Sequence, residues 1–124
     1  MDNKEILQIA NIVYPKIRKY YGVGRKNYPP IEVYKNILVR LTGEPDAEGE
    51  PADAEYDRKE NKLFLYSDYN NSVEDVIRSI IHEYVHYLQS ASWMGRYYKM
   101  GYDYTNHPYE LKASKEEENW KNFA

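Results

Sequence analysis

The segment from Ser72 to Ser92 is the feature that most constrains the fold, because its apolar residues recur at helical spacing. Asn71 or Ser72 can cap the first turn, and Glu74 and Asp75 suit the positive end of a helix. The residues expected to form a buried stripe are Ile77, Ile80, Ile81, Tyr84, Val85 and Leu88. The segment therefore predicts a long amphipathic helix packed against the core.

The same helix carries the pattern H-E-x-x-H at His82, Glu83 and His86. Residues four apart share one helix face, about 6 Å apart along the axis, so the two imidazoles can bind one metal ion. Glu83 can hold a water beside that ion, as in zinc hydrolases. The alternatives are ordinary surface or core histidines and an exposed carboxylate. Two of the chain's 3 histidines fall in this one pattern, which favours metal binding.

A catalytic zinc ion usually has three protein ligands, so a third ligand is expected elsewhere in the chain. The chain has no Cys, which leaves a histidine or a carboxylate. Glu110 is the preferred candidate because it follows Pro108 in the first turn of a predicted helix, far enough from His86 for the chain to reverse. Glu117 lies two turns further on the same face and is the second choice. His107 also competes, although it precedes the helix, where such a residue often serves as a cap.

The N-terminal half predicts the remaining parts of an α+β fold in a single domain of residues 1–124. Asn3 to Tyr21 has helical spacing, and Pro15 inside it is expected to kink or split the helix. Ile31 to Tyr34 predicts a strand. Ile37 to Leu41 suggests a second, buried strand, although a helix also fits so short an apolar run.

The C-terminal half predicts a hairpin and a last helix around the central one. Ala54 to Asp57 and Leu63 to Ser67 form the two strands of the hairpin, which completes a sheet of about three strands. Thr42 to Asp53 is a solvated loop and a candidate gate for the cleft. Trp93 to Asn106 is expected to be an aromatic connection, and the last helix runs from Pro108 to about Asn122.

Charge and hydropathy exclude several classes of partner. The formal net charge of the 124 residues is -3, so a basic nucleic-acid footprint is not expected. Met1 to Ile9 lacks the apolar run of a signal peptide, and no apolar stretch approaches the length of a membrane span. We therefore expect a cytoplasmic protein that acts neither on nucleic acid nor at a membrane.

Two motifs together resemble the gluzincin metallopeptidases. These are the His82–His86 motif on its helix and the later run His107-Pro108-Tyr109-Glu110-Leu111-Lys112-Ala113. Gluzincins pair an H-E-x-x-H helix with a glutamate helix, whose ligand typically lies in an E-x-x-A pattern. Glu110 and Ala113 match that pattern. The resemblance covers roughly Ala54 to Ala124, and the short chain is most similar to the minigluzincins.

The resemblance implies a small zincin-like catalytic core that holds one Zn²⁺ per chain. An N-terminal helix would back the active-site helix, and the strand Leu63 to Tyr66 would pair with an extended substrate. Many gluzincins place an acid four residues after the ligand Glu to orient a zinc-bound His. This chain has Ser114 there, and Glu117 is a possible substitute. Three residues are candidates for stabilising the oxyanion of the transition state: Tyr102, Tyr104 and His107.

Three functions follow as hypotheses. The first is a zinc-dependent peptidase, expected to be an endopeptidase, that acts on a peptide or protein substrate with Glu83 as general base and acid. The second is a latent or inactive zincin-like module that only grips a peptide or protein, with Trp120 to Ala124 as one source of latency. The third is a metal-stabilised domain with a closed site, which requires a fourth protein ligand such as His107.

Overall fold

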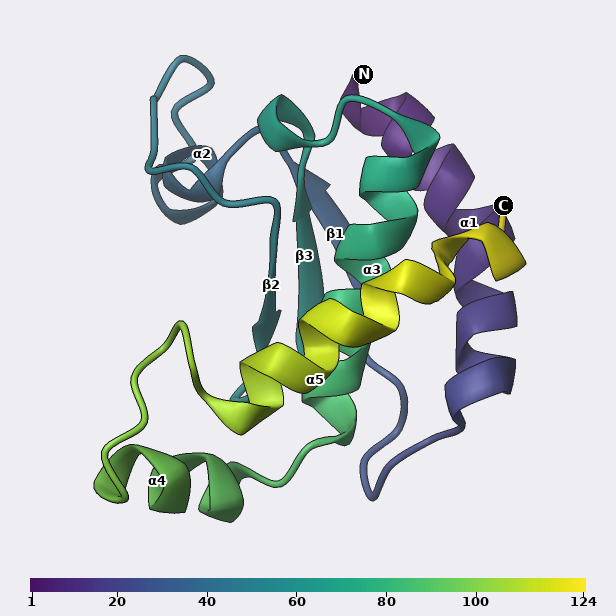
Figure 1. The fold of residues 1–124 in the computed structure, drawn as a ribbon. Helices are drawn as coiled ribbons and strands as arrows, with labels where there is room; N and C mark the ends of the chain where they lie inside the picture. Colours follow the sequence, from purple (N-terminus) through teal and green to yellow (C-terminus); the bar gives the residue numbers. More distant parts are fainter.

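A computed structural model of residues 1–124 places five α-helices around one sheet of three strands (Figure 1). The protein is therefore a small α+β fold. In chain order the elements are α1 (Asn3–Tyr21), β1 (Ile31–Tyr34), α2 (Ile37–Thr42), β2 (Ala54–Asp57), β3 (Lys62–Tyr66), α3 (Val73–Leu88), α4 (Ala91–Lys99) and α5 (Pro108–Glu116), with 3₁₀ turns at Ser67–Tyr69 and Glu117–Asn122.

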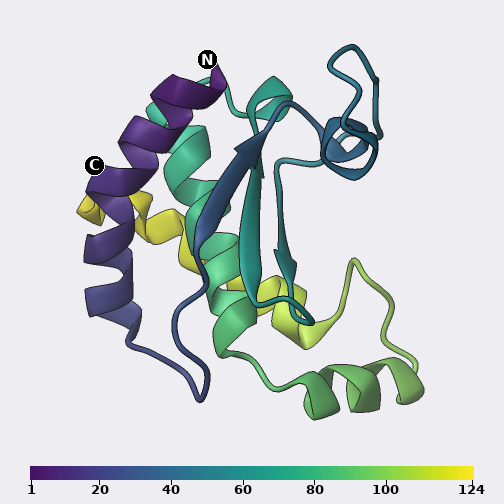
Figure 2. The same ribbon diagram turned by 180° about the vertical axis from the view of Figure 1, so that it is seen from behind.

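The motif helix α3 lies at the centre of the molecule, between the sheet and α5 (Figures 1 and 2). Ser72, one of the two caps that the sequence allowed, caps its first turn by accepting a hydrogen bond from the Asp75 amide at 3.1 Å. Most of its apolar side chains are buried against α1 and β3, whereas Val73 is exposed and Leu88 is partly buried. The core includes Ile6, Ile17, Leu63, Leu65, Ile77, Ile80, Ile81 and Tyr84. Because α3 is held on several sides, the orientation of its histidine face is fixed.

Helix α1 is one uninterrupted element, so the predicted split at Pro15 is wrong. Pro15 itself is exposed, while Val13, Tyr14 and Ile17 on either side of it are buried in the core. The Tyr14 hydroxyl also donates a hydrogen bond to the Pro29 carbonyl. Packing of this continuous apolar face against α3 outweighs the single backbone hydrogen bond that a proline removes.

The sheet has the strand order β1-β3-β2, with β1 parallel and β2 antiparallel to β3. The predicted hairpin is confirmed, with Tyr56 paired to Leu63. Its second strand, however, is the central strand of the sheet. The expectation that Leu63 to Tyr66 pairs with a substrate is therefore wrong, because β1 and β2 already occupy both of its edges. The edge that faces the motif helix belongs to β2, since the Tyr56 amide donates a hydrogen bond to Glu83.

Two segments without a clear helical prediction form helices. Ile37–Thr42 is α2, and Asn36 caps it by accepting a hydrogen bond from the Val39 amide at 2.9 Å. Ala91–Lys99 is α4, which replaces the first part of the predicted connection, and the motif helix ends at Leu88 instead of Ser92. Both are short elements, whose periodicity gives only a weak signal in a single sequence.

The C-terminal residues pack against α1 and away from β2 (Figure 1). Phe123 is buried, and its ring contacts Tyr20 and Tyr21. Trp120 also packs against the core. This placement argues against latency through Trp120 to Ala124, because the segment forms part of the core. No helix in the structure is both long enough and apolar enough to cross a membrane.

Candidate metal centre

The side chains of His82, His86 and Glu110 converge between α3 and α5. The Nε2 atoms of the two histidines lie 3.2 Å apart. One oxygen of Glu110 is 3.0 Å from His82 Nε2, and the other is 2.6 Å from His86 Nε2. The carboxylate predicted to be the third ligand thus faces both imidazoles, and these three residues form the cluster able to hold a metal ion.

The donor set and its spacing fit a zinc ion. Tetrahedral zinc with ligand bonds near 2.0–2.1 Å holds its ligand atoms about 3.3 Å from one another. The two Nε2 atoms, 3.2 Å apart, are close to that value, and with one oxygen of Glu110 the three ligand atoms all lie within 4.8 Å of one another. Two imidazoles and one carboxylate are also the donors found in catalytic zinc sites, where the fourth position is open.

Local structure at the start of α5 explains how Glu110 reaches the histidines. Pro108 occupies the first helical turn, and His107 caps it by accepting a hydrogen bond from the Tyr109 amide at 3.1 Å. One turn after Glu110, Ala113 is completely buried. A small residue there lets α5 lie close against α3, which places the Glu110 carboxylate within reach of both rings.

His107 is not a metal ligand in this arrangement. Its Nδ1 forms the cap, and its Nε2 lies 3.1 Å from the Met94 carbonyl oxygen, so both ring nitrogens have partners. The ring is buried and fixes α4 to the start of α5. The cluster therefore gains no fourth protein ligand from His107, which argues against the closed structural site and against His107 as an oxyanion stabiliser.

Both histidines of the cluster are oriented through their second ring nitrogen. Glu117 Oε2 lies 2.7 Å from His82 Nδ1, and Gln89 Oε1 lies 2.7 Å from His86 Nδ1. These contacts favour the tautomers that direct each Nε2 at the cluster. Ser114 is exposed and has no hydrogen bond to either ring, so the acid comes from Glu117, two turns after Glu110. Gln89 was not predicted, although its position three residues after His86 is a signal that could have identified it.

The protonation of each histidine and carboxylate in the cluster depends on its charged neighbours. Burial disfavours the charged form of His82, but hydrogen bonds to Glu110 and Glu117 outweigh it and raise the pKa of His82 to about 10. Burial likewise opposes ionisation of Glu110, yet hydrogen bonds to His82 and His86 lower its pKa to about 2. Without a metal, the cluster is thus a protonated imidazole held by carboxylates, and a metal ion would replace that proton.

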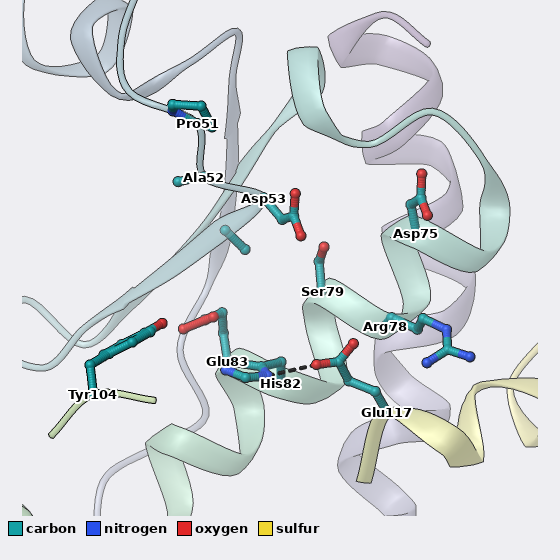
Figure 3. A pocket seen from close by; sticks show the side chains of 11 residues that line it. Pro51, Ala52, Asp53, Asp75, Arg78, Ser79, His82, Glu83, Tyr104 and Glu117 are labelled. Carbon is teal, nitrogen blue, oxygen red and sulfur yellow. Dashed lines mark hydrogen bonds and ion pairs between the residues drawn. The ribbon is translucent and has the colours of Figure 1, made fainter. Parts of the chain in front are cut away.

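Glu83 lies beside the cluster and points into a cavity (Figure 3). The Tyr56 amide of β2 donates a hydrogen bond to its Oε1 at 3.1 Å, which orients the carboxyl group. Burial raises the pKa of Glu83 to about 7, although the neighbouring His82 and His86 oppose the shift. A carboxyl group with such a pKa can both accept and release a proton near neutral pH.

Two cavities meet at Glu83. One, of about 300 Å³, extends past Asp53, Asp75 and Glu117, and residues 51–53 at the end of the long loop form part of its wall (Figure 3). The other, of about 360 Å³, extends toward α4 and the start of α5. Because Ala54 and Glu83 line both, the two cavities adjoin each other along β2, and together they are called the cleft.

Tyr104 is the aromatic residue that lines both cavities, and its hydroxyl points toward Glu83 (Figure 3). Tyr104 as a whole is 65% exposed, but partial desolvation of its hydroxyl and the nearby charges of Glu110 and Glu83 raise the pKa of Tyr104. Tyr102 lines neither cavity, and its ring packs on Tyr97. Of the three predicted oxyanion stabilisers, the structure thus brings only Tyr104 to the cleft with an available donor.

Comparison of the chain with protein-family models, with curated proteins and with solved structures gives no match. The case for function therefore rests on the residues of this cleft.

Proposed function

We propose that the protein is a zinc-dependent peptidase with a zincin-like catalytic core of the gluzincin type. His82, His86 and Glu110 would hold the ion, and Glu83 would move the proton. The observation that carries the proposal is the Glu110 carboxylate facing both Nε2 atoms, at 3.0 and 2.6 Å, while Glu83 is separately held by the Tyr56 amide. A ligand set and a distinct, oriented base are the two requirements of metal-assisted hydrolysis.

A zinc ion bound here would lower the pKa of a water and polarise the carbonyl of the scissile bond. Glu83 would accept the proton of the attacking water and pass it to the leaving amine. Its position beside the cluster, where the Tyr56 amide orients its carboxyl group, suits both steps. The Tyr104 hydroxyl, which lines the same cleft, would donate a hydrogen bond to the oxyanion that develops on the substrate carbonyl.

A peptide is the substrate that fits the walls of the cleft. Strand β2 is an edge of the sheet and borders the cleft through Ala54, Glu55 and Tyr56. An extended chain can add to such an edge through backbone hydrogen bonds, which bind peptides of many sequences. In this placement a peptide bond would lie between Glu83 and Tyr104.

The test compares zinc content and hydrolysis in matched variants. The wild type should contain about one zinc per chain by elemental analysis and cleave members of a quenched fluorescent peptide library, and His86→Ala should lose both properties. Glu83→Gln should keep zinc and lose cleavage. Glu118→Gln removes the same charge from an exposed position and should retain both.

Different results identify different errors. Zinc that remains bound in His86→Ala would show that the ligand assignment is wrong. Cleavage by Glu83→Gln at the wild-type rate would refute the role of the base. A zinc-loaded wild type that binds library peptides without cleaving any of them would support the binding-module alternative.

A further inference from the structure

A third cavity, of about 640 Å³, lies where β2 ends, between the loop after α1 and the start of α4. The four charged residues in its wall are all cations, namely Arg25, Lys26, Arg58 and Arg96. The whole chain has a net charge of -3, so this excess of positive charge is a local property. We call this space the basic cavity.

None of these four cations forms an ion pair with a carboxylate. Arg58 donates hydrogen bonds to the His86 and Gln89 carbonyl oxygens at 3.0 and 2.9 Å, and so caps the C-terminal end of α3. Lys26 donates to the Arg58 carbonyl oxygen, and the Arg96 guanidinium lies 4.7 Å from the centre of the Trp93 ring. Their partners are neutral, so the positive charge is uncompensated and attracts an anion.

The start of α4 adds to this field. Ser90, Ala91 and Ser92 line the basic cavity, so the positive end of the helix faces it. The Ser90 side chain caps none of the first amides, because its hydroxyl is paired with that of Ser92 at 2.9 Å. Backbone amides and guanidinium groups therefore border the same space, as in sites that hold carboxylates.

The basic cavity adjoins the proposed catalytic cleft. Tyr56 and Arg58 line both it and the 360 Å³ cavity next to Glu83. At the other end of β2, the 300 Å³ cavity is bordered by Asp53 and Glu117. A chain lying along β2 would thus pass from acidic walls, across Glu83, to basic walls.

Building on the proposed peptidase function, we propose that the basic cavity binds an acidic side chain of the substrate and so sets the direction and site of cleavage. An Asp or Glu a few residues from the scissile bond would reach the cavity while the peptide pairs with β2. A peptide is favoured over a single-stranded nucleic acid because the cavity adjoins the β2 cleft. In addition, Arg96 covers one face of the Trp93 ring, which is then closed to a stacking base.

Binding can be measured without hydrolysis in the zinc-loaded full-length Glu83→Gln protein. Acetylated, amidated hexaglutamate is titrated while backbone amide signals are recorded by NMR, with hexaglutamine as the neutral control. Hexaglutamate should shift the Ala91–Trp93 amides and the Trp93 indole signal. Adding Arg25→Gln and Arg96→Gln should weaken its binding about tenfold, since two exposed charge contacts are lost. Arg58 is left intact because it holds the end of α3.

The matched control adds Lys16→Gln and Lys19→Gln, two exposed cations on α1 with no ion pair. This variant loses the same charge and should bind hexaglutamate as before. If hexaglutamate affinity fell equally in both variants, the loss would come from net charge alone and the proposal would be overturned. Tighter binding of an oligothymidylate of equal charge, at the same amides, would overturn it in favour of nucleic acid.

A cleavage experiment separates this proposal from the peptidase function. Library peptides with Asp or Glu on one side of the scissile bond should be cleaved preferentially by the wild type, and Arg25→Gln/Arg96→Gln should lose the preference. Cleavage without any preference for acidic residues would refute the proposed role of the basic cavity but not the peptidase function. Hexaglutamate binding without cleavage of any peptide would refute the peptidase function but not anion binding by the basic cavity.

Discussion

The contact between Glu117 and His82 gives the sharpest quantitative prediction. Glu117 Oε2 lies 2.7 Å from His82 Nδ1, and its side chain is 24% exposed. In Glu117→Gln, an amide oxygen can still accept the hydrogen bond from Nδ1, but the negative charge is lost. A charge-assisted hydrogen bond contributes about 1.4 kcal/mol more than a neutral one, so zinc affinity should fall about tenfold.

Removing the hydrogen bond as well should have a larger effect. Glu117→Ala leaves the His82 ring free to rotate or to adopt the other tautomer. Loss of such an outer partner typically weakens metal binding 10- to 100-fold, and we expect about 100-fold for this variant. Ser114→Ala should leave affinity unchanged, because Ser114 is exposed and does not touch the cluster.

The assay is a competition titration of zinc against a chelator of known affinity at constant pH and ionic strength. Glu118→Gln is the matched control, since Glu118 is the adjacent, exposed carboxylate of the same 3₁₀ turn. Wild-type affinity in Glu117→Gln would show that the charge on Nδ1 does not matter. An equal loss in Glu118→Gln would show that only long-range charge acts, and the proposed orientation of His82 would be refuted.

Three further predictions concern the site and the core. Zinc binding near neutral pH should release the proton held by His82, whose pKa is raised to about 10, and calorimetry in buffers of different ionisation enthalpy would count that proton. For the same reason zinc affinity, measured by titration at several pH values, should keep rising above about pH 6.5. Tyr104→Phe should lower kcat about 100-fold with unchanged zinc affinity, whereas Tyr102→Phe should match the wild type in peptide assays. Ile17→Ala, at 0% exposure, should lower the free energy of unfolding by about 3 kcal/mol in urea titrations, and Ile12→Ala, at 64%, should change it little.

The elements with strong local signals could be predicted from the sequence. The cap at Ser72 and the apolar stripe located α3, and Pro108 located the start of α5. The hairpin was also recognisable, because its polar turn separates two short strands. The candidate metal cluster followed in part from these, since helical spacing places His82 and His86 on one face and a local start signal made Glu110 the preferred third ligand, with Glu117 and His107 still open.

Elements that depend on distant partners were predicted less well. The run Ile37 to Leu41 fits a strand or a helix equally, and the Asn36 cap together with its tertiary setting decides for α2. Strand order is a property of the folded sheet, so the sequence could not show that β3 is central and β2 is the edge. Pro15 was given too much weight because its cost is local, whereas the compensating burial of α1 is not.

By itself, the sequence determined which side chains could bind a metal and on which helices they lie, because helical periodicity and caps are encoded locally. Only the tertiary structure decided which groups support them. It placed Glu117 and Gln89 on the outer nitrogens, brought Tyr104 to the cleft in preference to Tyr102, and joined the basic cavity to the edge of β2. These contacts link residues from separate elements, and their distances are set by how α3, α4, α5 and the sheet pack together.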